Sequence, residues 1–173
     1  MPFRSSNVTA ANAVDAQAAY ESQMALWGAI MGGANLIEHA AGWMHGGLTA
    51  SFEKLILDAE MLQMMQAYLT PLATDAESLA LAAIAEVGPG GHFFGSRHTM
   101  ARYEKAFHTP MLSNWDNYPQ WLEKGRIEAP QRANAIWKQL VADYEQPPID
   151  PGIAEALTGY VARRKAEGGA PMN

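Results

Sequence analysis

The spacing of apolar residues along the chain predicts a protein built chiefly of helices. Between residues 16 and 31, four large apolar side chains recur every three or four positions, which places them on one face of a helix. They are Tyr20, Met24, Trp27 and Met31. Asp15 precedes this segment, and its carboxylate can accept hydrogen bonds from the free amides of the first turn, so we expect it to cap the helix.

A second helix is expected from Ser51 to about Tyr68. Its apolar residues cover more than half of its surface, which exceeds the single apolar stripe of an ordinary surface helix. We therefore expect this helix to be buried on several sides. Pro71, which cannot continue a helix, lies beyond its end.

Further helical segments follow, and glycine or proline separates them. They are expected at residues 75–87, 99–107, 129–144 and 151–165. In the first of these, the residues expected to face inward are Leu79, Ala82, Ala83, Ile84 and Val87. Between the second and the third, residues 110–125 are expected to form an arm held by its aromatic side chains, which are Trp115, Tyr118 and Trp121.

Strand signals are few. Residues 3–6 can be the end of a strand, and the apolar run at residues 35–37 can be a short buried strand, whereas residues 42–47 are expected to form a glycine-rich loop. A complete α/β domain would show more strands, each followed by a helix. Two interpretations stay open: an all-α domain, or a piece of a larger α/β protein. The unusually apolar helix at residues 51–68 favours the second.

Composition narrows the class of protein. The net charge of −6 argues against a nucleic-acid or anionic-membrane surface, and the basic run Arg163-Arg164-Lys165 is interpreted as a solvated helix end. There is no cysteine, which excludes disulfides, thiol catalysis and cysteine-based zinc sites and fits a cytoplasmic protein. The N-terminus carries no signal-peptide pattern, and no apolar stretch reaches the roughly 18 to 20 residues of a membrane span.

Several stretches of the chain resemble the trimethylamine methyltransferase family, and together they cover nearly its whole length. The most specific is Glu86-Val87-Gly88-Pro89-Gly90-Gly91-His92-Phe93, followed by Gly95 and His98-Thr99. The others are Arg4-Ser5-Ser6-Asn7, Asp15-Ala16-Gln17-Ala18-Ala19-Tyr20-Glu21, Gly33-Ala34-Asn35, Ala41-Gly42-Trp43, Ser51-Phe52-Glu53, Asp58-Ala59-Glu60 and residues 143–151.

The resemblance implies a fold and an activity. Family members are about three times longer and fold as a TIM barrel, so residues 1–109 would be the C-terminal part of the barrel and residues 110–173 a helical extension with a flexible tail. They transfer a methyl group from a methylated amine to the Co(I) of a corrinoid, which a separate small protein carries. The family's pyrrolysine would fall near Asn12. Many bacterial relatives lack pyrrolysine and act on quaternary amines such as glycine betaine, so an ordinary residue there puts trimethylamine itself in doubt as the substrate.

Candidate binding residues follow from the chemistry of that substrate class. A cation without N–H donors is held by aromatic faces and carboxylates, and the rings considered first are Trp43, Phe93 and Phe94. Core packing is the alternative for every ring, but the two phenylalanines lie in a glycine-rich loop, where binding residues are common. His92, Glu53 and Asn12 complete the candidate substrate or corrinoid contacts. For His92 the alternative is a structural hydrogen bond, and for Glu53 it is a helix-dipole partner.

Other chemistry is not favoured. His92 and His98 lack a third ligand and helical spacing, so no metal site is expected. Residues 88–91 lack the ending of a phosphate-binding loop. The leading hypothesis is thus a methyltransferase fragment that is inactive alone and self-associates through uncovered apolar faces. The alternatives are a non-catalytic remnant and a subunit that binds a second polypeptide to complete a split barrel.

Overall fold

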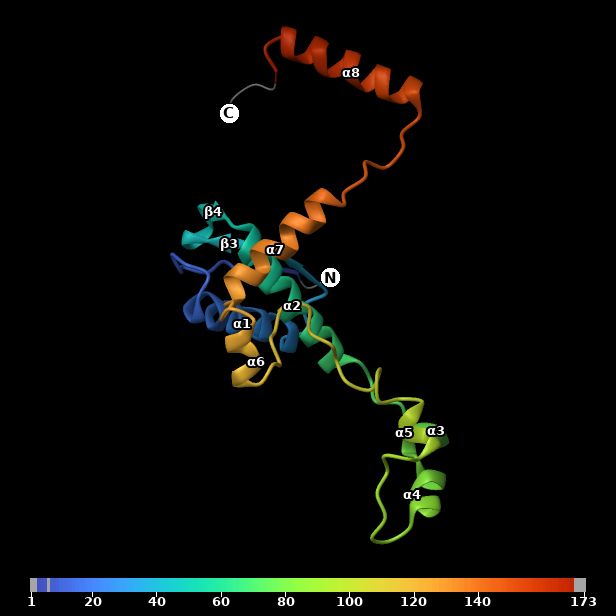
Figure 1. Ribbon diagram of the computed structural model, residues 1–173. Coiled ribbons are helices and arrows are strands. Elements are labelled where there is room, and N and C mark those ends of the chain that lie inside the picture. Colours follow the sequence, from blue (N-terminus) through green and yellow to red (C-terminus); the bar gives the residue numbers. More distant parts are fainter. Residues whose placement is uncertain (1–2, 6, 170–173) are drawn as a thin grey trace. The chain divides into compact units, whose positions relative to one another are not determined.

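The computed structural model describes residues 3–5 and 7–169 (Figure 1). Helices form most of its regular structure, as the periodicity predicts, and the described residues contain only two-stranded sheets. No helix among them is long and apolar enough to cross a membrane. Contacts divide the chain into one unit up to Gln139 and a second from Leu140 onward, and each is described by itself. The domain boundary implied by the family resemblance, at residues 109 and 110, stays a prediction.

The first unit begins with a strand, a helix and a parallel strand. β1 (Phe3–Ser5) pairs with β2 (Leu36–Glu38), with Phe3 opposite Leu36 and Ser5 opposite Glu38. The helix α1 (Ala16–Met31) connects them. Parallel neighbours require such a crossover, which is the repeating unit of α/β sheets. Both strand candidates of the sequence are therefore confirmed within the described residues, while Ser6 lies outside them.

The glycine-rich stretch after β2 is not a simple loop, which corrects the sequence interpretation. It contains β3 (Trp43–Met44) and the short helix η1 (His45–Gly47), and it continues into β4 (Thr49–Ala50), which pairs antiparallel with β3. Strands of two residues are too short to show apolar alternation, so no pattern in the sequence could reveal this hairpin.

The buried face of α1 is not its most apolar face. Its buried residues are Ala18, Ser22, Leu26 and Ala29, which are mostly small. The stripe that predicted the helix is exposed: Tyr20 is 62% exposed, Met24 74% and Met31 59%. Small residues allow close approach of the neighbouring backbone, and this decides which face packs inward. The expectation that the chain leaves apolar faces uncovered is confirmed for this stripe.

The helix α2 (Phe52–Leu69) begins after its cap Ser51, as predicted. Its buried residues are Lys54, Ile56, Asp58, Glu60 and Met65, so its packed side carries charges. Several of its large apolar residues are exposed instead, among them Leu55, Met64, Tyr68 and Leu69. The described residues therefore leave apolar faces of α2 uncovered, as the hypothesis of a fragment expects for a helix without enough partners in this chain.

The C-terminal part of the first unit packs on α2. Ile56 forms a small core with Leu112 and with Ala133 of α7 (Ala129–Ala142). The preceding arm contains α6 (Tyr118–Glu123). Of its rings, Trp115 and Tyr118 are exposed, whereas Trp121 is half-buried and its indole donates to the Ile127 carbonyl at 3.3 Å. The carboxylate of Glu60 supplies the attachment of the arm to α2.

That carboxylate accepts hydrogen bonds from the Leu112 amide, the Ser113 amide and the Ser113 hydroxyl. Glu60 is itself buried, and these donors satisfy its charge. The prediction of an arm pinned by aromatic residues is thus wrong for Trp115 and Tyr118, because buried polar contacts of Glu60 supply the attachment to α2.

Residues 75–100 differ from their predicted helices. Asp75 caps a helix, but Ala80 adopts a left-handed backbone with φ of 54° and divides it into α3 (Ala76–Leu79) and α4 (Leu81–Val87). Of the residues expected to face inward, Ala83 is buried, whereas Leu79 and Ile84 are about half exposed. The helix predicted at residues 99–107 is shorter and earlier, since α5 spans Arg97–Met100.

The second unit contains α8 (Pro151–Ala166), which matches the predicted segment closely. Asp150 caps it by accepting from the amides of Gly152 and Ile153, at 2.9 and 3.1 Å. Proline at its first position needs no amide partner there, so the local sequence is enough to start this helix.

We expect Leu26→Ala to lower the free energy of unfolding by about 2 to 5 kcal/mol, because the leucine side chain is fully buried and its loss leaves a cavity. Met24→Ala on the same helix is the matched control and should change it by less than about 0.5 kcal/mol, since Met24 is largely exposed. Urea unfolding followed by circular dichroism measures both. Equal losses would contradict the assignment of the buried face.

We also expect the chain to self-associate through the exposed stripe of α1, because apolar patches of this kind are rarely left in water. Replacing Tyr20, Met24 and Met31 together by Gln should shift the chain toward monomer in sedimentation velocity and keep the helical circular dichroism signal. A parent chain that stays monomeric at high concentration would show that the stripe is tolerated in water.

Candidate functional site

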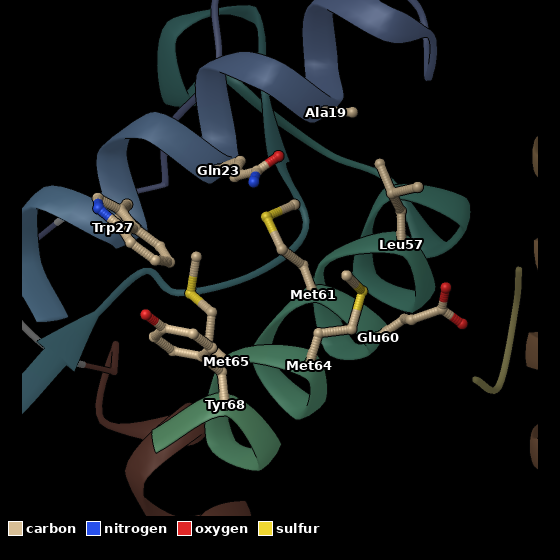
Figure 2. Close-up of a pocket in the computed structure, with 9 residues that line it drawn as sticks. All are labelled: Ala19, Gln23, Trp27, Leu57, Glu60, Met61, Met64, Met65 and Tyr68. Carbon is tan, nitrogen blue, oxygen red and sulfur yellow. The ribbon is translucent and has the colours of Figure 1, made fainter. Parts of the chain in front are cut away.

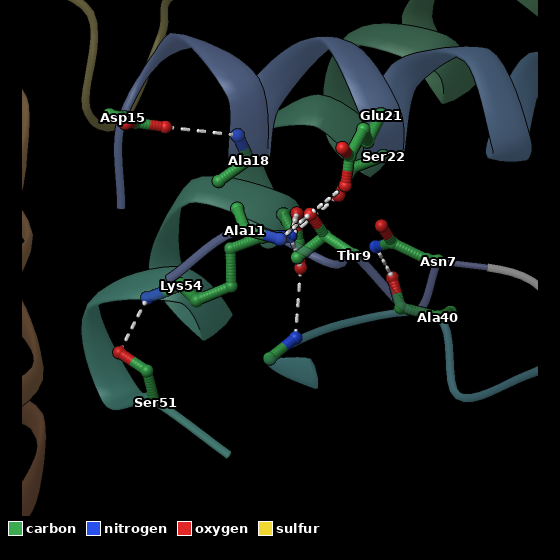
Figure 3. A network of polar contacts seen from close by, with 12 residues as sticks. Asn7, Thr9, Ala11, Asp15, Ala18, Glu21, Ser22, Ala40, Ser51 and Lys54 are labelled. Carbon is green, nitrogen blue, oxygen red and sulfur yellow. Dashed lines mark hydrogen bonds and ion pairs between the residues drawn. The ribbon is translucent and has the colours of Figure 1, made fainter. Parts of the chain in front are cut away.

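Two loops meet at the edge where β1 and β2 end, residues 7–12 after β1 and residues 39–47 after β2 (Figure 3). In parallel sheets, ligand sites form at the carboxyl ends of the strands. Four hydrogen bonds join the two loops. They are Asn7 Nδ2 to the Ala40 carbonyl, Thr9 N to the Trp43 carbonyl at 3.4 Å, His45 N to the Ala11 carbonyl at 3.3 Å and Gly46 N to the Thr9 carbonyl at 2.9 Å.

The backbone of these loops is strained. Asn7, His39 and His45 have φ values of 94°, 51° and 54°, a region that residues with a Cβ rarely adopt. Only two other non-glycine residues in the described part of the chain, Ala80 and Arg126, share this property. Strained residues persist where surrounding contacts hold them, and they gather at functional sites. The concentration here marks the two loops as the candidate site.

The first loop is fastened to α1 through Glu21. The Thr9 hydroxyl and the Ala10 amide both donate to the Glu21 carboxylate, the second at 2.8 Å (Figure 3). Donation by Thr9, and then by Gln17, lowers the pKa of Glu21 below its usual value. The carboxylate is therefore committed to holding the loop, with Thr9 fully buried beneath it.

Two of the residues predicted for the site lie on these loops. Asn12 is exposed on the first loop, and Trp43 is half-buried on the second. The Trp43 ring meets the His39 ring edge-on, with centroids 5.5 Å apart. The structure thus brings together the loop of Asn12 and the loop of Trp43, which are distant in sequence, and it leaves an aromatic ring at their junction.

Glu53 has different neighbours. Its carboxylate accepts from Asn134 Nδ2 at 2.7 Å and from the Trp137 indole at 2.8 Å, so it attaches α7 to the first turn of α2. The bond from Asn134, followed by that from Trp137, lowers the pKa of Glu53 to about 2. These contacts give Glu53 a structural task, and its predicted role at a binding site stays a prediction.

His92, Phe93 and Phe94 lie between α4 and α5. The rings of His92 and Phe94 are 5.8 Å apart, and Phe94 is 82% exposed, while Phe93 is about half exposed. The ring contact is local to this segment, so the described structure does not join it to the loops of Asn12 and Trp43. Its predicted role in binding stays a prediction.

An apolar groove runs between α1 and α2 (Figure 2). Its volume is about 310 Å³, and the rings of Trp27 and Tyr68 stand 5.6 Å apart at one part of its wall. Methionines line much of the rest, and Figure 2 shows Met61, Met64 and Met65 together on α2. Among the described residues, no group of three or more His, Asp and Glu side chains could hold a metal ion.

Comparison with known proteins identifies the family. The family model described as trimethylamine methyltransferase matches residues 1–169. The chain belongs to the trimethylamine methyltransferase family.

Similar family members differ in what their names say they act on. A glycine betaine methyltransferase of Desulfitobacterium hafniense is 40% identical over 156 residues, which cover 90% of this chain and 32% of that protein. A trimethylamine methyltransferase of the same species is 28% identical over 90% of this chain and 31% of its own length. A trimethylamine methyltransferase of Methanosarcina mazei is 26% identical over 85% of this chain and 29% of its own length. The chain spans about a third of the length of these relatives.

Sequence reasoning missed the buried polar residues that hold the first unit together. Asn7, Thr9, Lys54 and Asp58 are buried polar residues, and none was a candidate. The spacing of Lys54 and Asp58, four positions apart on one helix face, was a signal that could have suggested an ion pair. Nothing local in the sequence could reveal that the pair is buried.

We expect Glu53→Gln to lower the free energy of unfolding by about 1 to 3 kcal/mol at neutral pH, because a charged acceptor of two hydrogen bonds is lost. The folded-state pKa of about 2 lies below the ordinary value of 4.5, so this contribution is fully present above pH 4.5 and disappears as the pH falls toward 2.

Urea unfolding at several pH values tests this. The difference between the variant and the parent should shrink between pH 4.5 and 2. Glu123→Gln, at an exposed position near the end of α6, is the control and should show no such trend. A constant difference across this range would contradict the proposed hydrogen bonds.

Proposed function

We propose that this chain forms part of a methyltransferase site that takes a methyl group from a methylated or quaternary amine and passes it to a corrinoid carried by a partner protein. The observation that carries the proposal is the match of nearly the whole chain to the family, with two joined, strained loops at the carboxyl ends of its parallel strands. TIM-barrel enzymes build their sites from such loops.

The substrate class fits the residues at the junction of the loops. A quaternary ammonium group offers no N–H donor, so it is recognised by the face of an aromatic ring, a contact worth about 0.5 to 2 kcal/mol. Trp43 supplies such a ring, placed beside His39. Greater similarity to the glycine betaine methyltransferase, 40% identity against 26% and 28%, supports a betaine-like amine over trimethylamine.

The proposed acceptor also fits the surface of the loops. When bound, a Co(I) corrinoid supplies the electron pair that takes up the methyl group, while the amine keeps the pair of the broken C–N bond. The face of a corrin ring is broad and apolar. Val8 of the first loop is 42% exposed, and Leu48, which directly follows the second loop, is 88% exposed. These residues leave room for a large acceptor to approach, and the partner protein carries the corrinoid.

A second candidate function is a subunit that completes a barrel with another polypeptide. The exposed stripe of Tyr20, Met24 and Met31 on α1 favours it, since such a surface suits an apolar partner. In this case the loops at residues 7–12 and 39–47 serve a site whose other walls come from that polypeptide. Methyl transfer and complex formation, measured separately, distinguish the two functions.

We expect no measurable methylation of a Co(I) corrinoid protein by the purified chain with glycine betaine or trimethylamine. The described residues supply one strand–helix–strand unit, whereas catalysis requires loops from several strands, and a displacement of about 1 Å can cost about a hundredfold in rate. Adding the N-terminal two thirds of the Desulfitobacterium hafniense glycine betaine relative should restore turnover.

In the restored enzyme, Trp43→Leu should lower kcat/KM by about 2- to 30-fold, because the aromatic face is lost. Trp115→Leu, at an exposed position in the arm, is the matched control and should have little effect. Robust turnover by the chain alone would refute the hypothesis that its site is incomplete. A stable complex that never turns over would favour the second candidate function.

A further inference from the structure

A fully buried ion pair lies between α1 and α2. The side chains of Lys54 and Asp58 are both 0% exposed, and Lys54 Nζ lies 2.5 and 2.6 Å from the two carboxylate oxygens of Asp58. The hydroxyl of Ser22 on α1 accepts a third bond from Nζ at 2.6 Å. An ammonium group has three donors, so Lys54 is completely satisfied. Burying such a pair does not by itself stabilise a protein, and its purpose must be sought in what it holds.

The pair holds a backbone position outside both helices. Asp58 Oδ2 accepts from the amide of Gly42 at 2.8 Å, and the Gly42 carbonyl accepts from the Ser51 amide at 2.9 Å. Gly42 has a φ of 87°, which glycine adopts without the penalty of a Cβ. The buried Asp58 carboxylate thus fixes the N–H group of Gly42, and the Ser51 amide at the start of α2 fixes its carbonyl group.

From Gly42 the restraint passes directly to the candidate site. Trp43 follows in the chain, and its carbonyl accepts from the Thr9 amide of the first loop. His45 and Gly46, two and three residues further on, donate to the same first loop. The second loop is therefore held between Asp58 on one side and residues 9–11 on the other.

We propose that Asp58, oriented by its ion pair with Lys54, is a positioning residue that fixes the loop of residues 39–47 and so places Trp43 at the site; this role rests on the proposed function. A pair needed only to join the helices would require the bond from Lys54 to Ser22 and nothing beyond it. The bond from the Gly42 amide joins Asp58 of α2 to the loop and adds nothing to the contact between α1 and α2, so it directs the buried carboxylate at the loop.

The test is hydrogen exchange on the full chain, read peptide by peptide. The main variant is Lys54→Met with Asp58→Leu, which removes both charges together and keeps similar volumes, since removing one partner alone leaves an unpaired buried charge. Loss of a hydrogen bond to a charged acceptor should raise exchange in residues 39–50 by about tenfold or more. Exchange in α1 and α2 should change far less.

Leu26→Ala is the matched control, because it destabilises the same pair of helices without touching the bond to Gly42. It should raise exchange in the helices and the loop together. The proposal is overturned if the double variant leaves the loop unchanged, or if it behaves as this control does, since the pair would then only hold the helices.

A second measurement, which needs no variant, tests the proposal if the double variant does not fold. In the unaltered chain labelled with 15N-glycine, the Gly42 amide should exchange at least about a hundredfold more slowly than that of Gly95, which is exposed. Equal rates would overturn the proposal without any variant. Both measurements follow the loop and not methyl transfer, so their failure leaves the proposed function standing, and an inactive enzyme leaves this inference standing.

Discussion

Burying a charged side chain is costly unless its polar atoms are all paired, and α2 buries Lys54, Asp58 and Glu60. Each of them reaches out of the helix to a different part of the first unit. Lys54 bonds to Ser22 of α1, Asp58 to the Gly42 amide and Glu60 to the arm at residues 112 and 113. Glu53, in the first turn of the helix, accepts a hydrogen bond from Asn134 and so attaches α7. The need to satisfy these carboxylates and one ammonium group thus arranges the segments around α2.

This arrangement connects stability to function. The loops that follow β1 and β2 hold Asn7, His39 and His45 in left-handed conformations, which are unfavourable for residues with a Cβ. Such conformations persist because Glu21 fastens one loop to α1 and Asp58 fastens the other to α2. In a methyltransferase family, rigid loops at the carboxyl edge of the sheet suit a reaction in which donor and acceptor must be aligned.

Local signals in the sequence were sufficient for much of the fold. The caps Asp15, Ser51 and Asp150 lie within three residues of the amides they accept, so the starts of α1, α2 and α8 could be predicted. The family strings likewise identified the family, which the comparisons confirm. Sequence reasoning named Trp43 and Asn12 as candidates, and the structure joins their loops, while their role in binding stays a prediction. It did not find Lys54 and Asp58, which fix the second loop.

The sequence by itself determined where the main helices begin, that the chain is mostly helical and to which family it belongs, because these properties follow from neighbours a few positions apart. Only the tertiary structure decided which face of α1 is buried and what each charge on α2 holds. Glu60 accepts hydrogen bonds from Leu112 and Ser113, which lie 52 and 53 positions away in the sequence. The periodicity of apolar residues does not reveal such distant contacts. A buried carboxylate looks like a surface one until its distant donors are known.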